Sequence, residues 1–197
     1  MLFSLKPNIF FVHIPKNAGN SIRPLARKLG VKVLTHNIRR KNKRLLADYR
    51  NKRKIHAFCI SRNPYDRLVS AYHYLNNKTV HREDLADKEK YVTPFVDFDD
   101  FIKNGLAQAA KEQLHFLPQV FWVRNAEGKP EVESVLRVEH LQGDFDRFCE
   151  KMKLRKFTLQ VTNASKRKSW QDYYSEETKA IVQQVYRDDF EFFNYEK

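Results

Sequence analysis

The chain has 197 residues, which is enough for one compact domain of ordinary size. Hydrophobic residues make up 42% of it and aromatic residues 13%, so a packed core is expected and an intrinsically disordered protein is excluded. The 37 Lys and Arg residues against 24 Asp and Glu give a net charge of +13. That charge favours an anionic partner, such as a phosphate-bearing cofactor, a nucleic acid, an acidic glycan or a membrane surface.

The apolar runs, cysteines and histidines bear on compartment and metal binding. Residues 9–12, the longest purely apolar run near the start, are far fewer than the roughly 20 residues of a membrane span. No signal-peptide pattern precedes them, so we expect a cytoplasmic protein without a membrane span, although an anchor removed from the N-terminus stays open. Cys59 and Cys149 lie in apolar contexts that indicate buried thiols in a reducing compartment. The spacing of the seven histidines predicts no metal site.

The chain opens with a strand, a loop and a helix. Residues 9–14 form a continuous apolar run, which is typical of a strand buried on both faces. Asn20 or Ser21 can cap a following helix that ends at Gly30. A short second strand is expected over residues 31–34. The apolar face of the helix is expected to consist of Ile22, Leu25 and Leu29.

A third strand and a second helix follow. Residues 55–61 are expected to form the strand, and Pro64 suits the first position of a helix that continues to about Asn76. Residues 78–96 are largely polar and are interpreted as a surface excursion. The inward face of the second helix is expected to carry Leu68, Tyr72 and Leu75.

The last third of the chain continues the alternation. Asp97 or Asp99 can cap a short helix, residues 132–138 predict a fourth strand, and Ser175 begins a final helix. Strands that alternate with helices imply right-handed crossovers and a parallel sheet. The fold class is therefore α/β, with one domain over residues 1–197. The apolar positions expected to pack are Phe98, Phe101, Ile102, Phe145, Phe148, Met152, Ile181, Val182, Val185 and Tyr186.

The first segment that carries chemistry is the loop between the first strand and its helix. Backbone amides at a helix start, together with Lys16, Asn17, Asn20 and Ser21, form a ready anion site. The segment is not a Walker motif, because no Gly-Lys-Ser/Thr follows at the required spacing. An ordinary strand–helix connection is the alternative interpretation.

The second segment lies at the end of the third strand, where Arg62 is followed by Asn63 and Pro64. Arg67, Ser70 and Tyr74 fall at i, i+3 and i+7 and predict a polar stripe beside the inward face of the helix. An arginine fork and a hydroxyl that converge on one point can hold a terminal phosphate. The alternative is an ordinary exposed helix face.

Together the two segments resemble the signatures of sulfotransferases that use 3′-phosphoadenosine 5′-phosphosulfate, in particular the carbohydrate, family-2-like branch. There a P-K-x-(G)-x-S loop grips the 5′-phosphosulfate, and an R-(N/D)-P-x-x-R-x-x-S-x-Y segment grips the 3′-phosphate. The second pattern matches residues 62–72 at every marked position; in the first, Asn17 and Asn20 stand where the family often has Thr. Further likeness lies in residues 115–119 (His-Phe-Leu-Pro-Gln), 136–141, 163–165 and 186–190 (Tyr-Arg-Asp-Asp-Phe).

The resemblance implies a P-loop-like three-layer fold, with helices on both sides of a central parallel sheet, and in-line transfer of a sulfuryl group to a carbohydrate hydroxyl without a metal. Lys16 would donate to the bridging and sulfuryl oxygens. Arg62 and Ser70 would anchor the 3′-phosphate. The full set of residues expected to bind the nucleotide is Lys16, Asn17, Ala18, Gly19, Asn20, Ser21, Arg62, Ser70, Lys166 and Arg167.

The acceptor hydroxyl needs a general base. His36 lies just past the second strand, and ligands of open α/β sheets bind beyond the carboxyl ends of the strands. A histidine in this interval also serves as the base in some glycosaminoglycan members of the family, so His36 is the first candidate, with His115 and Glu139 in reserve. His13 is expected to lie inside the first strand and to be packed or to brace the loop, and His56 to lie at the opposite edge of the sheet.

Two other classes of protein remain as alternatives. One is a basic nucleic-acid-binding module, although no helix-turn-helix, zinc-finger or RNA-recognition pattern occurs. The other is a nucleotide-dependent phosphoryl transferase that uses the same loop, although the Walker Lys-Ser/Thr pair is missing. The basic run of residues 39–54 is either a solvated face or a track for a sulfated or uronate-bearing acceptor.

Overall fold

The computed structural model describes residues 8–35, 55–77, 82–160 and 168–197. The described chain divides into two compact units. We call the described part of residues 1–61 and 122–164 the sheet unit, and that of residues 62–121 and 165–197 the helical unit. The sequence predictions made for His36, for the basic run 39–54 and for Lys166 and Arg167 lie outside the described residues.

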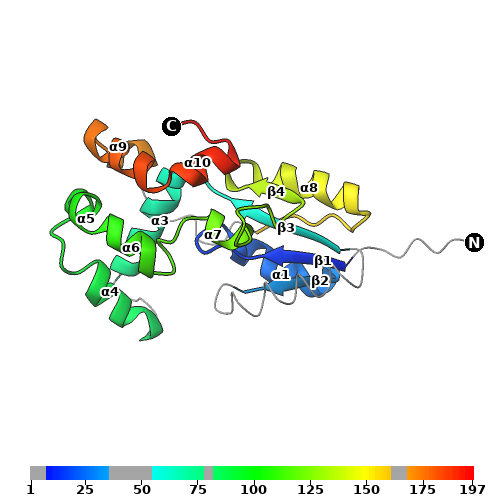
Figure 1. Ribbon diagram of the computed structural model, residues 1–197. Coiled ribbons are helices and arrows are strands. Elements are labelled where there is room, and N and C mark those ends of the chain that lie inside the picture. Colours follow the sequence, from blue (N-terminus) through cyan, green and yellow to red (C-terminus); the bar gives the residue numbers. More distant parts are fainter. Residues whose placement is uncertain (1–7, 36–54, 78–81, 161–167) are drawn as a thin grey trace, which may run out of the picture. The chain divides into compact units, whose positions relative to one another are not determined.

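Within its described residues, the sheet unit contains four parallel strands in the order β2-β1-β3-β4 (Figure 1). The register pairs Phe11 with Val33 on one side and with Phe58 on the other. Phe10 and Phe11 point to opposite faces of the sheet and are both fully buried, because this run is apolar at every position. The parallel α/β sheet predicted from the sequence is thus confirmed. The strands are β1 (Asn8–Val12), β2 (Val31–Leu34), β3 (Ile55–Ser61) and β4 (Ser134–Arg137).

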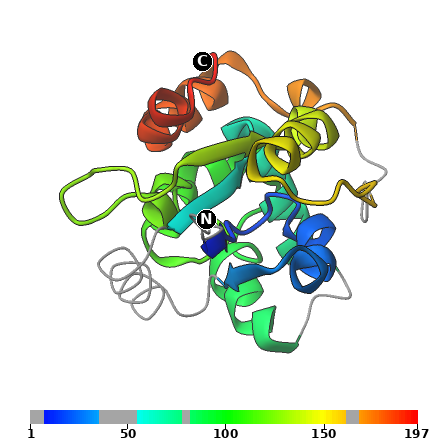
Figure 2. The ribbon, with the colours of Figure 1, turned by 90° about the vertical axis from the view of Figure 1, so that its right-hand side faces the viewer.

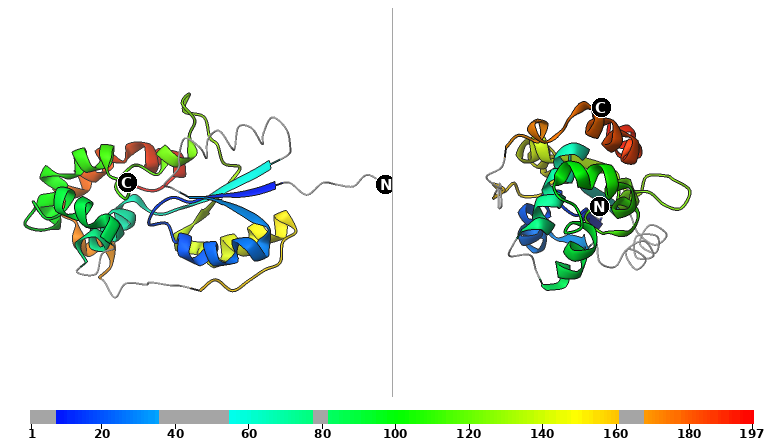
Figure 3. Two further views of the ribbon diagram at one scale, coloured as in Figure 1. Left: turned by 90° about the horizontal axis from the view of Figure 1, so that it is seen from below. Right: turned by 90° about the vertical axis from the view of Figure 1, so that its left-hand side faces the viewer.

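Two helices cover one face of this sheet, α1 (Gly19–Leu29) and α8 (Leu141–Met152), as the views in Figures 2 and 3 show. Their apolar residues join those of the strands in one core, where the ring of Phe58 lies 4.4 Å from that of Phe148. Helix α1 ends at Gly30, whose φ of 67° is left-handed, as expected of a glycine C-cap.

The helical unit has a separate core, which includes Leu68, Tyr72, Phe101, Phe116 and Phe190. No helix in the described ranges is long and apolar enough to cross a membrane. The unit contains α3 (Pro64–Asn76), α4 (Leu85–Tyr91), α5 (Phe98–Asn104), α6 (Leu106–Glu112), α9 (Glu176–Val185), α10 (Arg187–Phe193) and 3₁₀ helices at Arg82–Asp84 and Trp170–Tyr173. The four-residue helix α7 (Val120–Val123) spans the sequence boundary between the units.

Three helix starts form as the sequence predicted. Asn63 accepts a hydrogen bond from the Tyr65 amide and precedes Pro64. Asp97 caps α5 by accepting from the Asp100 amide, and Ser175 forms a capping box at α9. These positions are predictable because a short polar side chain satisfies amides that the first helical turn leaves without partners.

Other boundaries differ from the prediction. Helix α1 begins at Gly19 after Ala18, so Asn20 and Ser21 are already helical and neither is the N-cap. In the interval interpreted as a surface excursion, α4 forms, and Tyr91 and Val92 are buried in the core of the helical unit. These two buried side chains, together with Phe95 packed against the same core, anchor an otherwise polar segment.

Candidate functional site

The loop between β1 and α1 is shaped by its backbone. Lys16 and Ala18 have φ values of 68° and 53°, a left-handed conformation that residues other than glycine seldom adopt. Ala18 is the N-cap of α1, and no described side chain forms a capping hydrogen bond there. Turns with left-handed residues that lead into a helix start point backbone amides at anions. Lys16, half-buried, adds a cation to this turn.

Asn17 fastens the loop to the neighbouring strand. Its side chain is 1% exposed, and Nδ2 donates to the carbonyl oxygen of Ile60 over 2.7 Å. Its backbone amide donates to Ile14, which closes the turn. Asn17, which the sequence suggests as a phosphate ligand, therefore has a structural part in the loop.

His13 and Gly19 are packed against each other. His13 is buried, and its amide donates to Leu34 at the end of β2. A Cβ atom added at Gly19 would lie 2.0 Å from Nε2 of His13, a distance that no side chain tolerates. The glycine is needed here for close packing. The expected packing of His13 is confirmed, but the residue lies just after β1, which ends at Val12, and not inside the strand.

Ser21 ties the first turn of α1 to an extended segment, which we call the strap (residues 154–160). Its hydroxyl is buried and donates to the carbonyl of Gln160 over 2.9 Å. A hydroxyl has a single proton, so Ser21 cannot donate to Gln160 and to a phosphate at the same time. Ser21 could still accept a hydrogen bond while it holds the strap.

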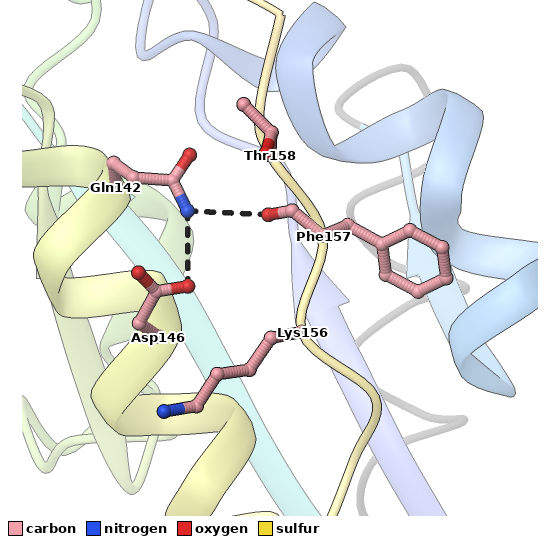
Figure 4. A pocket seen from close by; sticks show the side chains of 5 residues that line it. All are labelled: Gln142, Asp146, Lys156, Phe157 and Thr158. Carbon is pink, nitrogen blue, oxygen red and sulfur yellow. Dashed lines mark hydrogen bonds between the residues drawn. The ribbon is translucent and has the colours of Figure 1, made fainter.

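Gln142 of α8 holds the strap from the other side. Its Nε2 donates to the carbonyl of Phe157 over 3.1 Å and to Asp146 over 2.9 Å, while its Oε1 accepts from the amide of Leu159 over 2.7 Å. Figure 4 shows the amide between the helix and the strap, with the Phe157 ring turned away toward α1. An open cavity of about 350 Å³ lies here, lined by Gln142, Asp146, Lys156, Phe157 and Thr158. This cavity is shallow, and its lining includes no residue of the β1–α1 loop.

In the helical unit, both the backbone and the side chain of Arg62 are held in place. Arg62 Nε donates to Asp66 over 2.7 Å, with the two side chains 15% and 19% exposed. The Arg62 amide donates to Oε1 of Gln119, and Nε2 of Gln119 donates back to the Arg62 carbonyl. Ser70 is half-buried and lies four residues after Asp66, on the same side of α3.

The predicted polar stripe on α3 is wrong for Arg67, which is 2% exposed and lies inside the helical unit. Burial lowers the pKa of its guanidinium, while the neighbouring Tyr186 and Asp189 oppose that shift. Tyr74 donates its hydroxyl to Asp84 over 2.6 Å. The helical spacing was predicted correctly. The side chains that bury Arg67 come from segments distant in the sequence, and a local pattern carries no information about them.

Asp189, at the end of the chain, is fully buried opposite Arg67. Its two carboxylate oxygens accept from the amides of Gln119 and Val120, each over 2.8 Å. Burial raises the pKa of Asp189 to about 6, and the Arg67 guanidinium and the two amides hold it from rising further. The group is therefore mainly ionised at neutral pH.

The candidate bases lie in different surroundings. His115 is 8% exposed, and its Nδ1 lies 3.1 Å from Gln113 Nε2. Glu139 is exposed in the 3₁₀ helix Val138–His140 directly after β4, so it lies at the carboxyl edge of the sheet, where the β1–α1 loop also begins. His56 lies near the start of β3, bonded to Ser134 over 2.8 Å, at the opposite edge as expected. Burial lowers the pKa of His56.

Three further residues, Asp66, Gln119 and Asp189, organise Arg62 directly or through one another. Asp66 could have been found, because an acidic residue four positions after an arginine is a standard ion-pair spacing. Gln119 and Asp189 lie in stretches that resemble the sulfotransferases, but a local pattern could not connect them to Arg62. Their pairing depends on the tertiary fold.

The described residues form a parallel α/β fold with a left-handed turn between its first strand and the following helix. The model of the sulfotransferase family matches residues 1–196. The chain therefore belongs to the sulfotransferase family and is a transferase. No curated protein and no solved structure gave a significant match to the chain.

Proposed function

We propose that this enzyme transfers the sulfuryl group of 3′-phosphoadenosine 5′-phosphosulfate to a hydroxyl of a carbohydrate. The observation that carries the proposal is the β1–α1 loop, in which Lys16 adopts a left-handed conformation three residues before α1. Membership of the sulfotransferase family supports the reaction class. The high net charge of +13 supports an anionic donor and an acidic acceptor.

The 5′-phosphosulfate would occupy the β1–α1 loop, held by Lys16 and by amides at the start of α1. Arg62 and Ser70 would bind the 3′-phosphate as a charge-assisted fork and a hydroxyl. The bond from Asn17 to Ile60 holds the β1–α1 loop against β3 within the sheet unit. Ala18, Gly19, Asn20 and Ser21 would complete the loop side, and Lys166 and Arg167 would close over the phosphates.

The donor supplies an activated sulfuryl group whose bond to the 5′-phosphate breaks as the acceptor oxygen forms its bond to sulfur. Lys16 would donate to the bridging oxygen and so stabilise the charge that develops on the leaving phosphate. The acceptor proton would pass to a general base, for which we propose His36, with Glu139 and His115 as alternatives. The products are a sulfate ester and adenosine 3′,5′-bisphosphate.

For the acceptor, we propose a carbohydrate that carries sulfate or uronate groups. The support is the basic run of residues 39–54, which follows the second strand in the sequence. A run of cations would attract an acidic polymer over a distance of about 10 Å at moderate ionic strength. A neutral acceptor would gain nothing from it.

A comparison of ligands by thermal unfolding tests the reaction class. Adenosine 3′,5′-bisphosphate, ATP with magnesium and a short oligonucleotide are added separately; a ligand at 100 times its Kd stabilises a protein by about 2.7 kcal/mol. We expect the bisphosphate to stabilise most. A larger shift with ATP–magnesium would indicate a phosphoryl transferase, and one with the oligonucleotide a nucleic-acid-binding protein. Transfer of radiolabelled sulfate to a panel of acidic and neutral glycans then tests the acceptor.

A further inference from the structure

A buried glutamine holds the backbone of Arg62 at two points. Oε1 of Gln119 accepts from the Arg62 amide over 3.0 Å, and Nε2 donates to the Arg62 carbonyl over 2.9 Å. Gln119 is 0% exposed, so water cannot replace these bonds without opening the core. The paired bonds fix the position and orientation of the Arg62 main chain, from which the guanidinium extends.

Gln119 is itself held by Asp189. The carboxylate accepts from the amides of Gln119 and Val120 at the same distance, one bond to each oxygen. Asp189 is 0% exposed, and its charge is balanced by Arg67, which is also buried. Hydrogen bonds thus run from Asp189 through Gln119 to Arg62, all within the helical unit, and Arg67 supplies a countercharge to Asp189.

A gain in stability does not by itself explain why Arg67, Gln119 and Asp189 are buried together. A buried charged pair costs desolvation energy that a pair of apolar residues would not, so replacing it by a hydrophobic pair often leaves stability unchanged or improves it. What such a network can provide is a fixed geometry. Here it leads to Arg62, whose side chain is partly exposed and is oriented further by Asp66.

We propose that Gln119 and Asp189 are positioning residues that set Arg62 for recognition of a nucleotide 3′-phosphate. The proposal rests on the proposed function. Phosphate is bound bidentately by arginine only when the planar fork is correctly placed, and a displacement of about 1 Å at such a site can cost on the order of a hundredfold. It also assigns a role to the stretches 115–119 and 186–190, which contain Gln119 and Asp189.

The test is the preference for the 3′-phosphate, measured by calorimetry as the Kd for adenosine 5′-monophosphate divided by that for adenosine 3′,5′-bisphosphate. Gln119→Met keeps the length of the side chain and removes both bonds to Arg62. We expect this ratio to fall about tenfold or more, while the Kd for the monophosphate changes less than about threefold. An unchanged ratio in a folded variant would overturn the proposal.

Gln113→Met is the matched control. Gln113 is equally a buried glutamine of the helical unit, 2% exposed, and its bonds go to His115, Phe116 and Asp87, not to Arg62. A merely structural effect of losing a buried amide would alter both variants alike. We expect the Gln113 variant to lose stability and to retain the ratio; a matching fall of its ratio would count against a specific role of Gln119.

Two further arms separate the possible failures. In an Arg62→Ala background, Gln119→Met should lower the ratio no further, because Gln119 acts through Arg62; an additional fall would contradict the proposal. If Gln119→Met does not fold, Gln119→Asn, which withdraws the amide by one methylene, is measured for the same fall. If the wild-type enzyme shows no preference for the bisphosphate, the proposed function fails. If the wild type shows this preference and the Gln119 variants show it equally, the positioning role fails and the proposed function stands.

Discussion

The β1–α1 loop and the start of α3 are held in their conformations by different kinds of interaction. The loop is set by its backbone: left-handed residues at Lys16 and Ala18, and a glycine in contact with His13. The start of α3 is set by side chains, with Arg62 held by Gln119 and Asp66. The loop presents backbone amides, and an atom added at Gly19 would disturb its packing. The start of α3 presents a guanidinium, and the loss of a hydrogen-bond partner would disturb the position of that group.

The difference predicts opposite sensitivities. In the loop, substitutions that add volume should damage the structure, and removal of the Lys16 side chain should damage the reaction alone. At α3, removal of a remote polar group should change the properties of Arg62.

Lys16→Ala should lower kcat by about 10²–10³-fold, because the proposed donor to the developing charge is lost. The fold should survive, since Ala18 shows that alanine adopts a left-handed conformation in this loop. Steady-state kinetics and urea unfolding measure the two effects. Lys32→Ala, at an exposed position on β2, should retain the wild-type rate. A Lys16→Ala enzyme with near-normal turnover would remove the lysine from the chemistry.

Asp189 should make stability depend on pH. Burial raises its pKa to about 6, above the value of about 3.9 in an unfolded chain. The folded state therefore holds this proton more tightly, and the resulting contribution to the free energy of unfolding is complete below about pH 4 and is lost as the pH rises through about 6. The asparagine of the Asp189→Asn variant does not titrate, so the stability of that variant lacks this decrease with rising pH.

Urea unfolding of both proteins between about pH 4 and pH 7 measures the effect. The stability of the wild type minus that of the variant should decrease by up to about 3 kcal/mol over this range. The subtraction removes the carboxylates common to both proteins. A difference that is constant or rises with pH would show that the Arg67 guanidinium and the two amides outweigh burial, so that the pKa of Asp189 is not raised.

Gly19→Ala should destabilise the protein by about 1–3 kcal/mol, the usual cost of overpacking. The reason is the 2.0 Å distance between the added Cβ and the His13 ring. His13→Ala in the same chain should recover part of the loss, because it removes the atoms that clash. Unfolding midpoints of the single and double variants give the coupling between the two sites.

Gly143→Ala is the matched control for that substitution. Gly143 lies within α8, and a Cβ there would meet Arg147 at an ordinary 3.5 Å. Alanine should stabilise this helix by about 0.5–1 kcal/mol. Equal effects at Gly19 and Gly143 would mean that the loop is not closely packed.

Much of the fold was predictable because its signals are local. The four strands follow apolar runs such as residues 55–61, and the α3 start follows from Asn63 and Pro64. The start of α1 was misjudged because a left-handed Ala18 replaces a polar cap. Left-handed alanine has no sequence signature, since its conformation is imposed by the packing of Asn17 and Gly19 on their neighbours.

In the candidate site, too, the features with local signals were predictable and those that depend on tertiary contacts were not. Lys16 and Arg62 could be selected because each stands at the end of a strand within a recognisable motif. The burial of Arg67 and the bonds from Asp189 to Gln119 were not predictable, because they join segments about 70 to 120 residues apart in the sequence. Periodicity describes which residues share a helix face, but not what lies against that face.

We propose that Lys16 and Arg62 act on one nucleotide. Calorimetric titration of adenosine 3′,5′-bisphosphate into the wild type, Lys16→Ala and Arg62→Ala is the decisive measurement. We expect a single site in the wild type and a Kd that rises by about tenfold or more in each variant, because each loses a charge-assisted contact to phosphate. A wild type that does not bind the bisphosphate, or a variant that binds it as tightly as the wild type, would contradict the account.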